Sequence, residues 1–183
     1  MPTQNPVNLK HAEPYLCSQD YVAYTAEQHE TWATLVERRH PQIEEHACAE
    51  YLDGYQVLGI RGDRIPNLAS ITSRLQPRTG WSTTPVTGFM PALAFFEMLA
   101  ARHFPSTTWL RDRSSLESPP EPDLFHDVFG HVPMHAHKVL ADFLQYYGQL
   151  CLSAQDEVAL EKLGRVFWYT VEFGLIRQNR KLK

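Results

Sequence analysis

Two histidines and two acids stand close together in an apolar segment of this sequence. His126 and His131 lie among Leu, Phe and Val residues, together with Asp123 and Asp127. Imidazole and carboxyl groups in an apolar environment cost free energy unless a partner satisfies them. Such groups can bind a metal ion, or they can hydrogen-bond within a core. The segment is therefore the first candidate for a functional site.

The spacing of the two histidines limits how both could reach one ion. In a regular α-helix, residues five positions apart point about 140° away from one another. A widened turn of the π-helical kind would bring both onto one face, and Gly130, directly before His131, permits such a turn. The alternative is that one histidine lies beyond the end of the helix.

A further candidate is Glu172, the only ionisable carboxyl group in the bulky run 167–175. A buried, unpaired carboxylate is costly, and a nearby cation would resolve that cost. Two neutral imidazoles and one carboxylate form the facial triad that binds non-haem Fe(II) and leaves positions open for other ligands. His126, His131 and Glu172 are therefore the candidate metal ligands.

Simpler interpretations of these residues stay open. A buried histidine is most often a hydrogen-bonded core residue, and Glu172 could face a cleft or pair with an arginine. The same three ligands could hold zinc, as in hydrolases with two histidines and one acid. We interpret the neighbouring His135 and His137 as solvated surface residues.

Composition excludes several classes of protein. The 183 residues include 17 Lys+Arg and 21 Asp+Glu, and the resulting charge of −4 is unlike that of a nucleic-acid-binding protein. Three scattered cysteines, Cys17, Cys48 and Cys151, indicate neither a disulfide framework nor a thiolate zinc site and favour the cytoplasm. The sequence contains no signal-peptide core and no apolar run of about 18 residues, so we expect no membrane association.

The elements that must position the candidate residues are mainly helical. Apolar periodicity and capping signals predict helices over 25–40, 43–59, 67–75, 91–100, 139–150 and 158–167, with Pro41 and Pro77 as helix ends and Ser153 opening the last cap. Short strands are predicted over 81–87 and 107–110. We therefore expect a mainly α fold with a small β element, in which residues 1–17 form an N-terminal arm and residues 18–183 one domain.

Two long motifs make the sequence recognisable. Residues 121–133 (EPDLFHDVFGHVP) and 167–175 (FWYTVEFGL) closely resemble the two signature segments of the pterin-dependent aromatic amino acid hydroxylases. The resemblance also covers residues 63–66, 79–81 and 104–105, so it spans nearly the whole chain. Within that family the sequence is most similar to the short bacterial phenylalanine 4-hydroxylases.

The resemblance implies the single catalytic-domain fold of that family and a mononuclear Fe(II) monooxygenase. Such an enzyme uses a tetrahydropterin and O2 to place a hydroxyl group on the ring of a free amino acid, phenylalanine in this case. It implies iron ligands His126, His131 and Glu172; pterin contacts Gly88, Phe89, Met90 and Phe95; and substrate contacts Arg111, Pro122, Asp123 and Trp168. Phe95 would stack on the pterin, and Arg111, held by Asp123, would bind the substrate carboxylate.

Without the motifs, these residues have ordinary structural interpretations. Met90, Phe95 and Trp168 would be core residues, Asp123 a helix cap, and Arg111 a member of a solvated charge cluster.

The chain ends soon after Glu172, where members of the family continue, so we expect a truncated member and a monomer. A metal- or pterin-binding module without turnover and a zinc hydrolase are the alternative functions.

Overall fold

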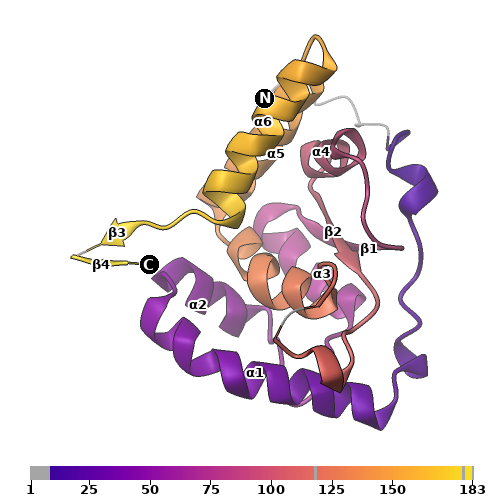
Figure 1. Ribbon diagram of the computed structural model, residues 1–183, viewed down its shortest axis with the longest axis vertical. Helices are drawn as coiled ribbons and strands as arrows, with labels where there is room; N and C mark the ends of the chain where they lie inside the picture. The colour runs from indigo at the N-terminus through magenta and orange to yellow at the C-terminus, as the bar shows by residue number, and fades with distance from the viewer. Residues whose placement is uncertain (1–8, 118, 179, 183) are drawn as a thin grey trace.

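Helices account for most of the structure, as the apolar periodicity predicts (Figure 1). The fold is given by a computed structural model that describes residues 9–117, 119–178 and 180–182. The α-helices are α1 (Ala26–His46), α2 (Ala49–Val57), α3 (Leu68–Thr79), α4 (Ala92–Ala100), α5 (Lys138–Leu152) and α6 (Glu157–Phe167). The strands are β1 (Ser82–Val86), β2 (His103–Thr107), β3 (Arg177–Gln178) and β4 (Lys181–Leu182). The prediction of a mainly α fold with a small β element is confirmed.

The larger of two apolar clusters among the described residues lies between the helices. α1 contributes Trp32 to it, and the residue before β1 contributes Trp81; both indole rings are fully buried. Each indole N–H donates to a main-chain carbonyl, that of Arg61 (2.9 Å) and that of Ala141 (3.2 Å) respectively, so neither buried donor is unpaired. Leu124 joins the same core. The segment with the candidate histidines is therefore built directly on it.

β1 and β2 form a parallel pair joined through α4. Ser82 lies opposite His103, and Val86 lies opposite Thr107. Because the carboxyl ends of parallel strands meet at one edge, the loop after β1 and the segment after β2 begin on the same side of the pair. β3 and β4 form a separate antiparallel pair near the C-terminus, and Figure 1 shows it standing away from the helices.

Two prolines that we predicted to end helices lie inside them. Pro41 lies within α1 and Pro77 within α3, so both helices are longer than predicted. Proline removes the donor to the carbonyl four residues earlier, here that of Glu37 or of Ser73. These residues and both prolines are exposed, so solvent can hydrate the carbonyls. The predicted second helix consequently begins only at Ala49.

The position of β2 and one helix cap also differ from prediction. β-propensity favoured residues 107–110, but the register with β1 fixes the strand over 103–107, including Pro105. Proline is tolerated because β2 pairs only with β1, which leaves one edge without ladder bonds. Asp156 itself caps α6, whereas the predicted cap began at Ser153. The caps predicted at Thr25 and Asn67 are confirmed.

Residues 15–17 lie along the free edge of β1, at the side of the molecule where Figure 1 shows the indigo segment. Leu16 pairs with Val86 in an antiparallel bridge, and the Thr87 N–H donates to the Tyr15 carbonyl (2.9 Å). Residues 1–8 of the predicted arm are outside the described residues. Among the described helices, none combines the length and the apolar character needed to cross a bilayer.

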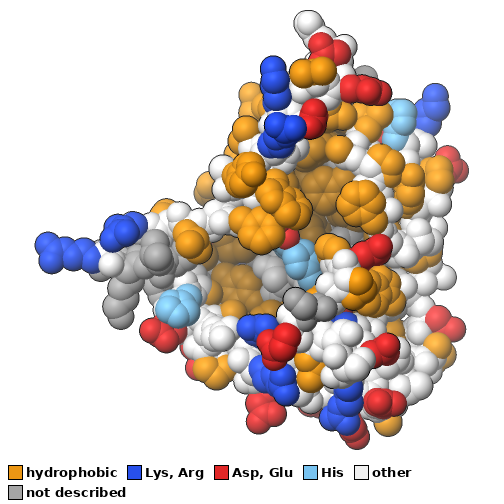
Figure 2. All heavy atoms as spheres, viewed as in Figure 1, with side chains coloured by type: hydrophobic (Ala, Val, Ile, Leu, Met, Phe, Trp, Pro, Cys, Tyr) orange, Lys and Arg blue, Asp and Glu red, His pale blue; other side chains and the backbone are white. Residues whose placement is uncertain are grey.

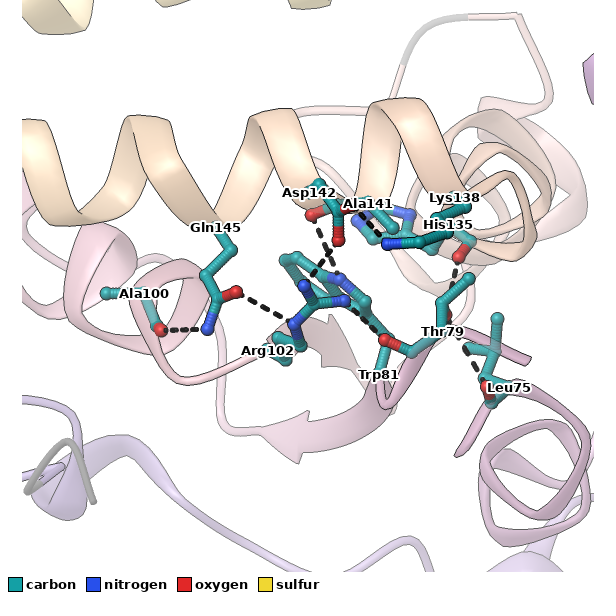
Figure 3. Close-up of polar contacts among 10 residues, drawn as sticks. All are labelled: Leu75, Thr79, Trp81, Ala100, Arg102, His135, Lys138, Ala141, Asp142 and Gln145. Atoms are coloured by element: carbon teal, nitrogen blue, oxygen red, sulfur yellow. Dashed lines mark hydrogen bonds and ion pairs between the residues drawn. The ribbon is translucent and has the colours of Figure 1, made fainter. Parts of the chain in front are cut away.

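Arg102 ties the turn after α4 to α5 (Figure 3). It adopts a φ of 60°, and its guanidinium donates to Gln145 (2.9 Å), to Asp142 (2.5 Å) and to the carbonyl of Thr79. The Thr79 hydroxyl in turn donates to the carbonyl of His135 (2.8 Å). This network fixes α5 to the 3-10 segment 132–136, which directly follows the candidate histidines.

Candidate metal centre and adjoining cavity

A π-helical turn, His126–His131, places both histidines on one side of the chain; we call it the first π-turn. The ring centroids lie 4.8 Å apart, and the two Nε2 atoms lie 3.2 Å apart. Of the two arrangements that the five-residue spacing allowed, the structure has the widened turn. Gly130 has open space where a Cβ atom would lie, so the turn does not need glycine there for room.

A second π-turn, Trp168–Glu172, brings Glu172 to the two rings. The Phe173 N–H closes it by donating to the Trp168 carbonyl (3.0 Å). Glu172 Oε1 lies 3.2 Å from His126 Nε2, and Oε2 lies 3.1 Å from His131 Nε2. Two separate π-turns thus present the three candidate ligands to one another.

The donor set fits a single divalent ion. One nitrogen or oxygen atom from each residue lies within 4.8 Å of the others, and this is the one such group found among the described residues. Nitrogen ligands bind transition ions at about 2.1 Å, so neighbouring ligands are about 3.0 Å apart at right angles and about 3.4 Å apart in a tetrahedron. The two Nε2 atoms lie 3.2 Å apart, and each lies 3.1–3.2 Å from a different oxygen of Glu172, which is close to the right-angle spacing.

The charges within this group also suit a cation. Burial would raise the pKa of Glu172, but hydrogen bonds with His126 and His131 outweigh burial and lower that pKa. Burial would likewise lower the pKa of His126, yet Glu172 and the nearby acids raise it. The carboxyl group is thus held as an anion between two imidazoles, and an ion in the same place would satisfy all three groups.

Asp127 fastens the first π-turn to the end of β2. One of its buried carboxyl oxygens accepts from the Thr107 N–H (2.7 Å) and from the Thr107 hydroxyl (2.9 Å). Burial raises the pKa of Asp127, and Thr107 and His126 oppose that rise. From α2, the Tyr51 hydroxyl donates to the carbonyl of Phe129. A strand and a helix therefore hold the main chain of the turn.

His135 is buried, which corrects the prediction that it is a solvated surface residue. It is 2% exposed, and its ring lies 4.6 Å from that of Trp81 and 4.7 Å from that of Phe104, centroid to centroid. Its Nδ1 donates to the carbonyl of His131 (3.0 Å), and burial lowers its pKa to about 3. The short 3-10 segment turns this residue inward, whereas His137 is half-buried.

An open cavity of about 310 Å³ adjoins the three candidate ligands, all of which line it. Figure 2 shows a hollow among hydrophobic side chains, with histidine visible inside it. The aromatic lining consists of Phe89, Phe95, Phe96, Phe104, Phe167 and Trp168. Aromatic walls beside a small group of polar atoms are typical of sites for flat organic ligands.

The four residues expected at a pterin all line this cavity. Gly88, Phe89 and Met90 belong to the loop between β1 and α4, and Phe95 belongs to α4. Gly88 has a φ of 155°, which residues with a Cβ atom rarely adopt. Phe89 is 82% exposed, whereas Met90 is buried. The ring of Phe95 lies 5.5 Å from that of Phe167, centroid to centroid.

The four residues expected at the substrate separate into two pairs. Pro122 and Trp168 line the cavity, and Trp168 is 54% exposed. Arg111 and Asp123 are buried and are not part of the lining. Arg111 donates from Nε (2.8 Å) and Nη2 (2.7 Å) to Asp123, and from Nη1 to the Leu116 carbonyl (3.1 Å). Each terminal nitrogen keeps one further N–H beyond these bonds.

Sequence reasoning did not assign several residues that support the site. Asp127 was noted only as an acid beside His126, although a carboxyl group next to a candidate ligand is a common supporting contact. Phe104 belongs to a segment that the resemblance covers, and Thr107 to a predicted strand, but neither received a role in the site, because only the register of β2 brings them to the cavity.

Comparison with known proteins gives a consistent result along the chain. Residues 4–183 match the family described as biopterin-dependent aromatic amino acid hydroxylase. The phenylalanine-4-hydroxylase of Chromobacterium violaceum is 43% identical over 175 residues, which cover 95% of this chain and 59% of that protein. The tyrosine 3-monooxygenase of Rattus norvegicus is 43% identical over 178 residues, which cover 95% of this chain and 35% of that protein.

The fold agrees as well. A crystal structure of the Chromobacterium violaceum phenylalanine hydroxylase, with bound iron(III) and oxidised 7,8-dihydrobiopterin, matches with a TM-score of 0.89 and 42% identity. The match covers 94% of this chain and 63% of that one, so the chain spans less than two thirds of these relatives. Sequence, fold and the convergence of two histidines with one glutamate agree that the chain belongs to the biopterin-dependent aromatic amino acid hydroxylase family.

Proposed function

We propose that this chain is a phenylalanine 4-monooxygenase, which hydroxylates L-phenylalanine to L-tyrosine with Fe(II), a tetrahydropterin and O2. The observation that carries the proposal is the convergence of His126, His131 and Glu172 on one wall of an aromatic cavity, in a chain of this family.

His126, His131 and Glu172 would hold the iron. When bound, Fe(II) and the reduced pterin supply the activation of O2 and the oxidation of the ring, chemistry that protein side chains do not provide. Asp127 would hold the turn that carries the first ligand through its bonds to Thr107. The side chains would therefore bind and orient the metal, the pterin and the substrate instead of moving protons.

The pterin would lie against the wall made by the loop 88–90 and Phe95. The ring of Phe95 is half-buried and keeps its place through Phe96 and Phe167, at centroid distances of 5.3 and 5.5 Å. A ring held in this way offers a fixed face on which a flat heterocycle can stack.

The amino acid would lie on the side of Pro122 and Trp168. Arg111 would bind its carboxylate with the N–H groups that Asp123 and Leu116 leave free, and the fork of a guanidinium suits a carboxylate. Sequence identity does not decide between phenylalanine and tyrosine as the substrate, because the phenylalanine-4-hydroxylase and the tyrosine 3-monooxygenase are both 43% identical to this chain. We propose phenylalanine because the motifs are most similar to those of the bacterial enzymes.

The test is product formation by the chain loaded anaerobically with Fe(II). With tetrahydrobiopterin, O2 and L-phenylalanine, we expect tyrosine by chromatography, and we expect less than about 1% of that rate in Glu172→Gln because a metal ligand is lost. Binding of iron and pterin without any product would instead identify a binding module. Zinc in protein purified without added metal, together with hydrolysis of a model ester, would identify a hydrolase.

We further propose that residues 18–183 form the catalytic domain, with residues 1–17 as its arm, and that the protein acts in the cytoplasm as a monomer. Its free cysteines support a reducing compartment: Cys17, Cys48 and Cys151 are unpaired in the described structure. Sedimentation at micromolar concentration is expected to give one species near 21.1 kDa. A dimer would contradict the monomer.

A further inference from the structure

Glu97 is an acid of α4 that the proposed chemistry does not use, and it is 5% exposed. One of its carboxyl oxygens accepts two main-chain hydrogen bonds, from the His11 N–H and from the Ala12 N–H, each at 2.8 Å. Ala12 is fully buried, so without Glu97 its N–H would lose its partner away from solvent. Glu97 therefore anchors the N-terminal arm to α4.

The anchored arm continues along the edge of β1. The Tyr15 carbonyl accepts from the Thr87 N–H (2.9 Å), and the Cys17 N–H donates to the Pro85 carbonyl (3.1 Å). Thr87 is the residue directly before Gly88. The arm thus fixes the point at which the chain leaves β1 and enters the loop that lines the cavity.

A small apolar cluster joins the arm, the loop after β1 and α4. It contains Ala12 from the arm, Val86 from the end of β1, Met90 from the loop, and Ala94 and Met98 from α4. The last two stand four residues apart, so they share one face of the helix. Phe89, between the buried residues Val86 and Met90, has little support of its own because it is 82% exposed.

We propose that Glu97 is a positioning residue for the pterin: it clamps residues 11–12, and the arm then holds the loop 87–90 in its binding shape. The inference rests on the proposed role of Gly88, Phe89, Met90 and Phe95. Glu97 itself is not in the cavity lining, so it acts through the arm.

The test combines amide hydrogen exchange with cofactor binding in the 183-residue chain. In Glu97→Met, which keeps the length but removes the acceptor, we expect exchange at His11, Ala12 and Thr87 to accelerate by about tenfold or more. Affinity for 7,8-dihydrobiopterin, measured by calorimetry on the Fe(II)-loaded chain, should fall by about tenfold, with iron affinity unchanged.

Two variants separate positioning from general loss of stability. Glu97→Gln keeps a carbonyl acceptor, so it should lie between the parent and Glu97→Met in both measurements. Leu99→Val lowers the stability of α4 on its core-facing side without touching the arm, and it should change neither measurement. Equal effects of Leu99→Val and Glu97→Met would overturn the proposal.

Loss of the clamp at His11 and Ala12 with unchanged protection of Thr87 would also overturn the proposal, because the arm would then not control the loop. If the parent chain binds iron but no dihydrobiopterin, the proposed function fails in its pterin part. Exchange at Thr87 in Glu97→Met still decides whether Glu97 holds the loop.

Discussion

Asp123 performs two roles that the sequence offered as alternatives. It accepts from the main-chain N–H of His126 (3.0 Å), as a helix cap does, and it also pairs with the guanidinium of Arg111. Burial would raise the pKa of Asp123, but the bonds from Arg111 and His126 keep it below its ordinary value. A single carboxylate therefore sets both the start of the ligand segment and the place of the proposed substrate arginine.

Removing this charge is expected to cost much more stability than removing an exposed one. Asp123→Asn leaves the Arg111 guanidinium buried without an anion, which costs about 3 kcal/mol of unfolding free energy. Glu117→Gln breaks only exposed ion pairs with Arg38 and Arg39 and should cost less than about 1 kcal/mol. Urea denaturation measures both. Equal losses would show that Asp123→Asn does not leave an unpaired buried charge at Arg111.

At the scale of elements, α2 supports the site through a close approach of main chains. A Cβ atom on Gly54 would lie 1.9 Å from the carbonyl oxygen of Pro133, in the 3-10 segment that follows His131. The Tyr51 hydroxyl on the same helix donates to the carbonyl of Phe129. The position of α2 is therefore coupled to that of the first π-turn.

Two glycines in different helices, Gly54 in α2 and Gly164 in α6, give a matched test of that coupling. Gly54→Ala forces α2 away from Pro133 and is expected to lower stability by about 1–3 kcal/mol. Gly164→Ala in α6 has open space and should raise stability by about 0.5–1 kcal/mol, because alanine favours the helix. Urea denaturation compares them. A gain in both variants would mean that α2 adjusts freely.

How much the sequence predicts depends on whether a feature is local. The Thr25 and Asn67 caps follow from neighbouring residues and are confirmed, and the widened turn is one of the two arrangements that the spacing of the histidines allowed. Pro41 and Pro77 were misjudged because their effect depends on solvent access to carbonyls one turn earlier.

Features fixed by tertiary contacts could not be predicted. The strand over 103–107 is set by its register with β1, and His135 is buried because Trp81 and Phe104 meet it from distant segments. The motifs named candidate ligands, but their convergence requires both π-turns, and Trp168–Glu172 gave no sign of a π-turn in the sequence.

At the scale of the whole molecule, a bound ion would join the first π-turn, which carries His126 and His131, to the second, which carries Glu172. Because an ion that binds only the folded chain stabilises it by mass action, Fe(II) at about 100 times its Kd adds about 2.7 kcal/mol. For a chain of this size we expect Tm to rise by about 5–10 °C, measured anaerobically by circular dichroism. A chelator should reverse the rise, and an unchanged Tm would show that the folded chain does not bind iron preferentially.

The most direct measurement is an anaerobic calorimetric titration of Fe(II) into the parent chain and into His126→Ala, with His137→Ala as the control. His137 is half-buried and outside the ligand group, so its loss should leave binding intact. We expect one ion per parent chain, and a loss of affinity of more than about a hundredfold in His126→Ala, because one of three protein ligands is removed. Equal affinity for Fe(II) in His126→Ala and the parent would contradict the assignment of His126, His131 and Glu172 as the metal centre.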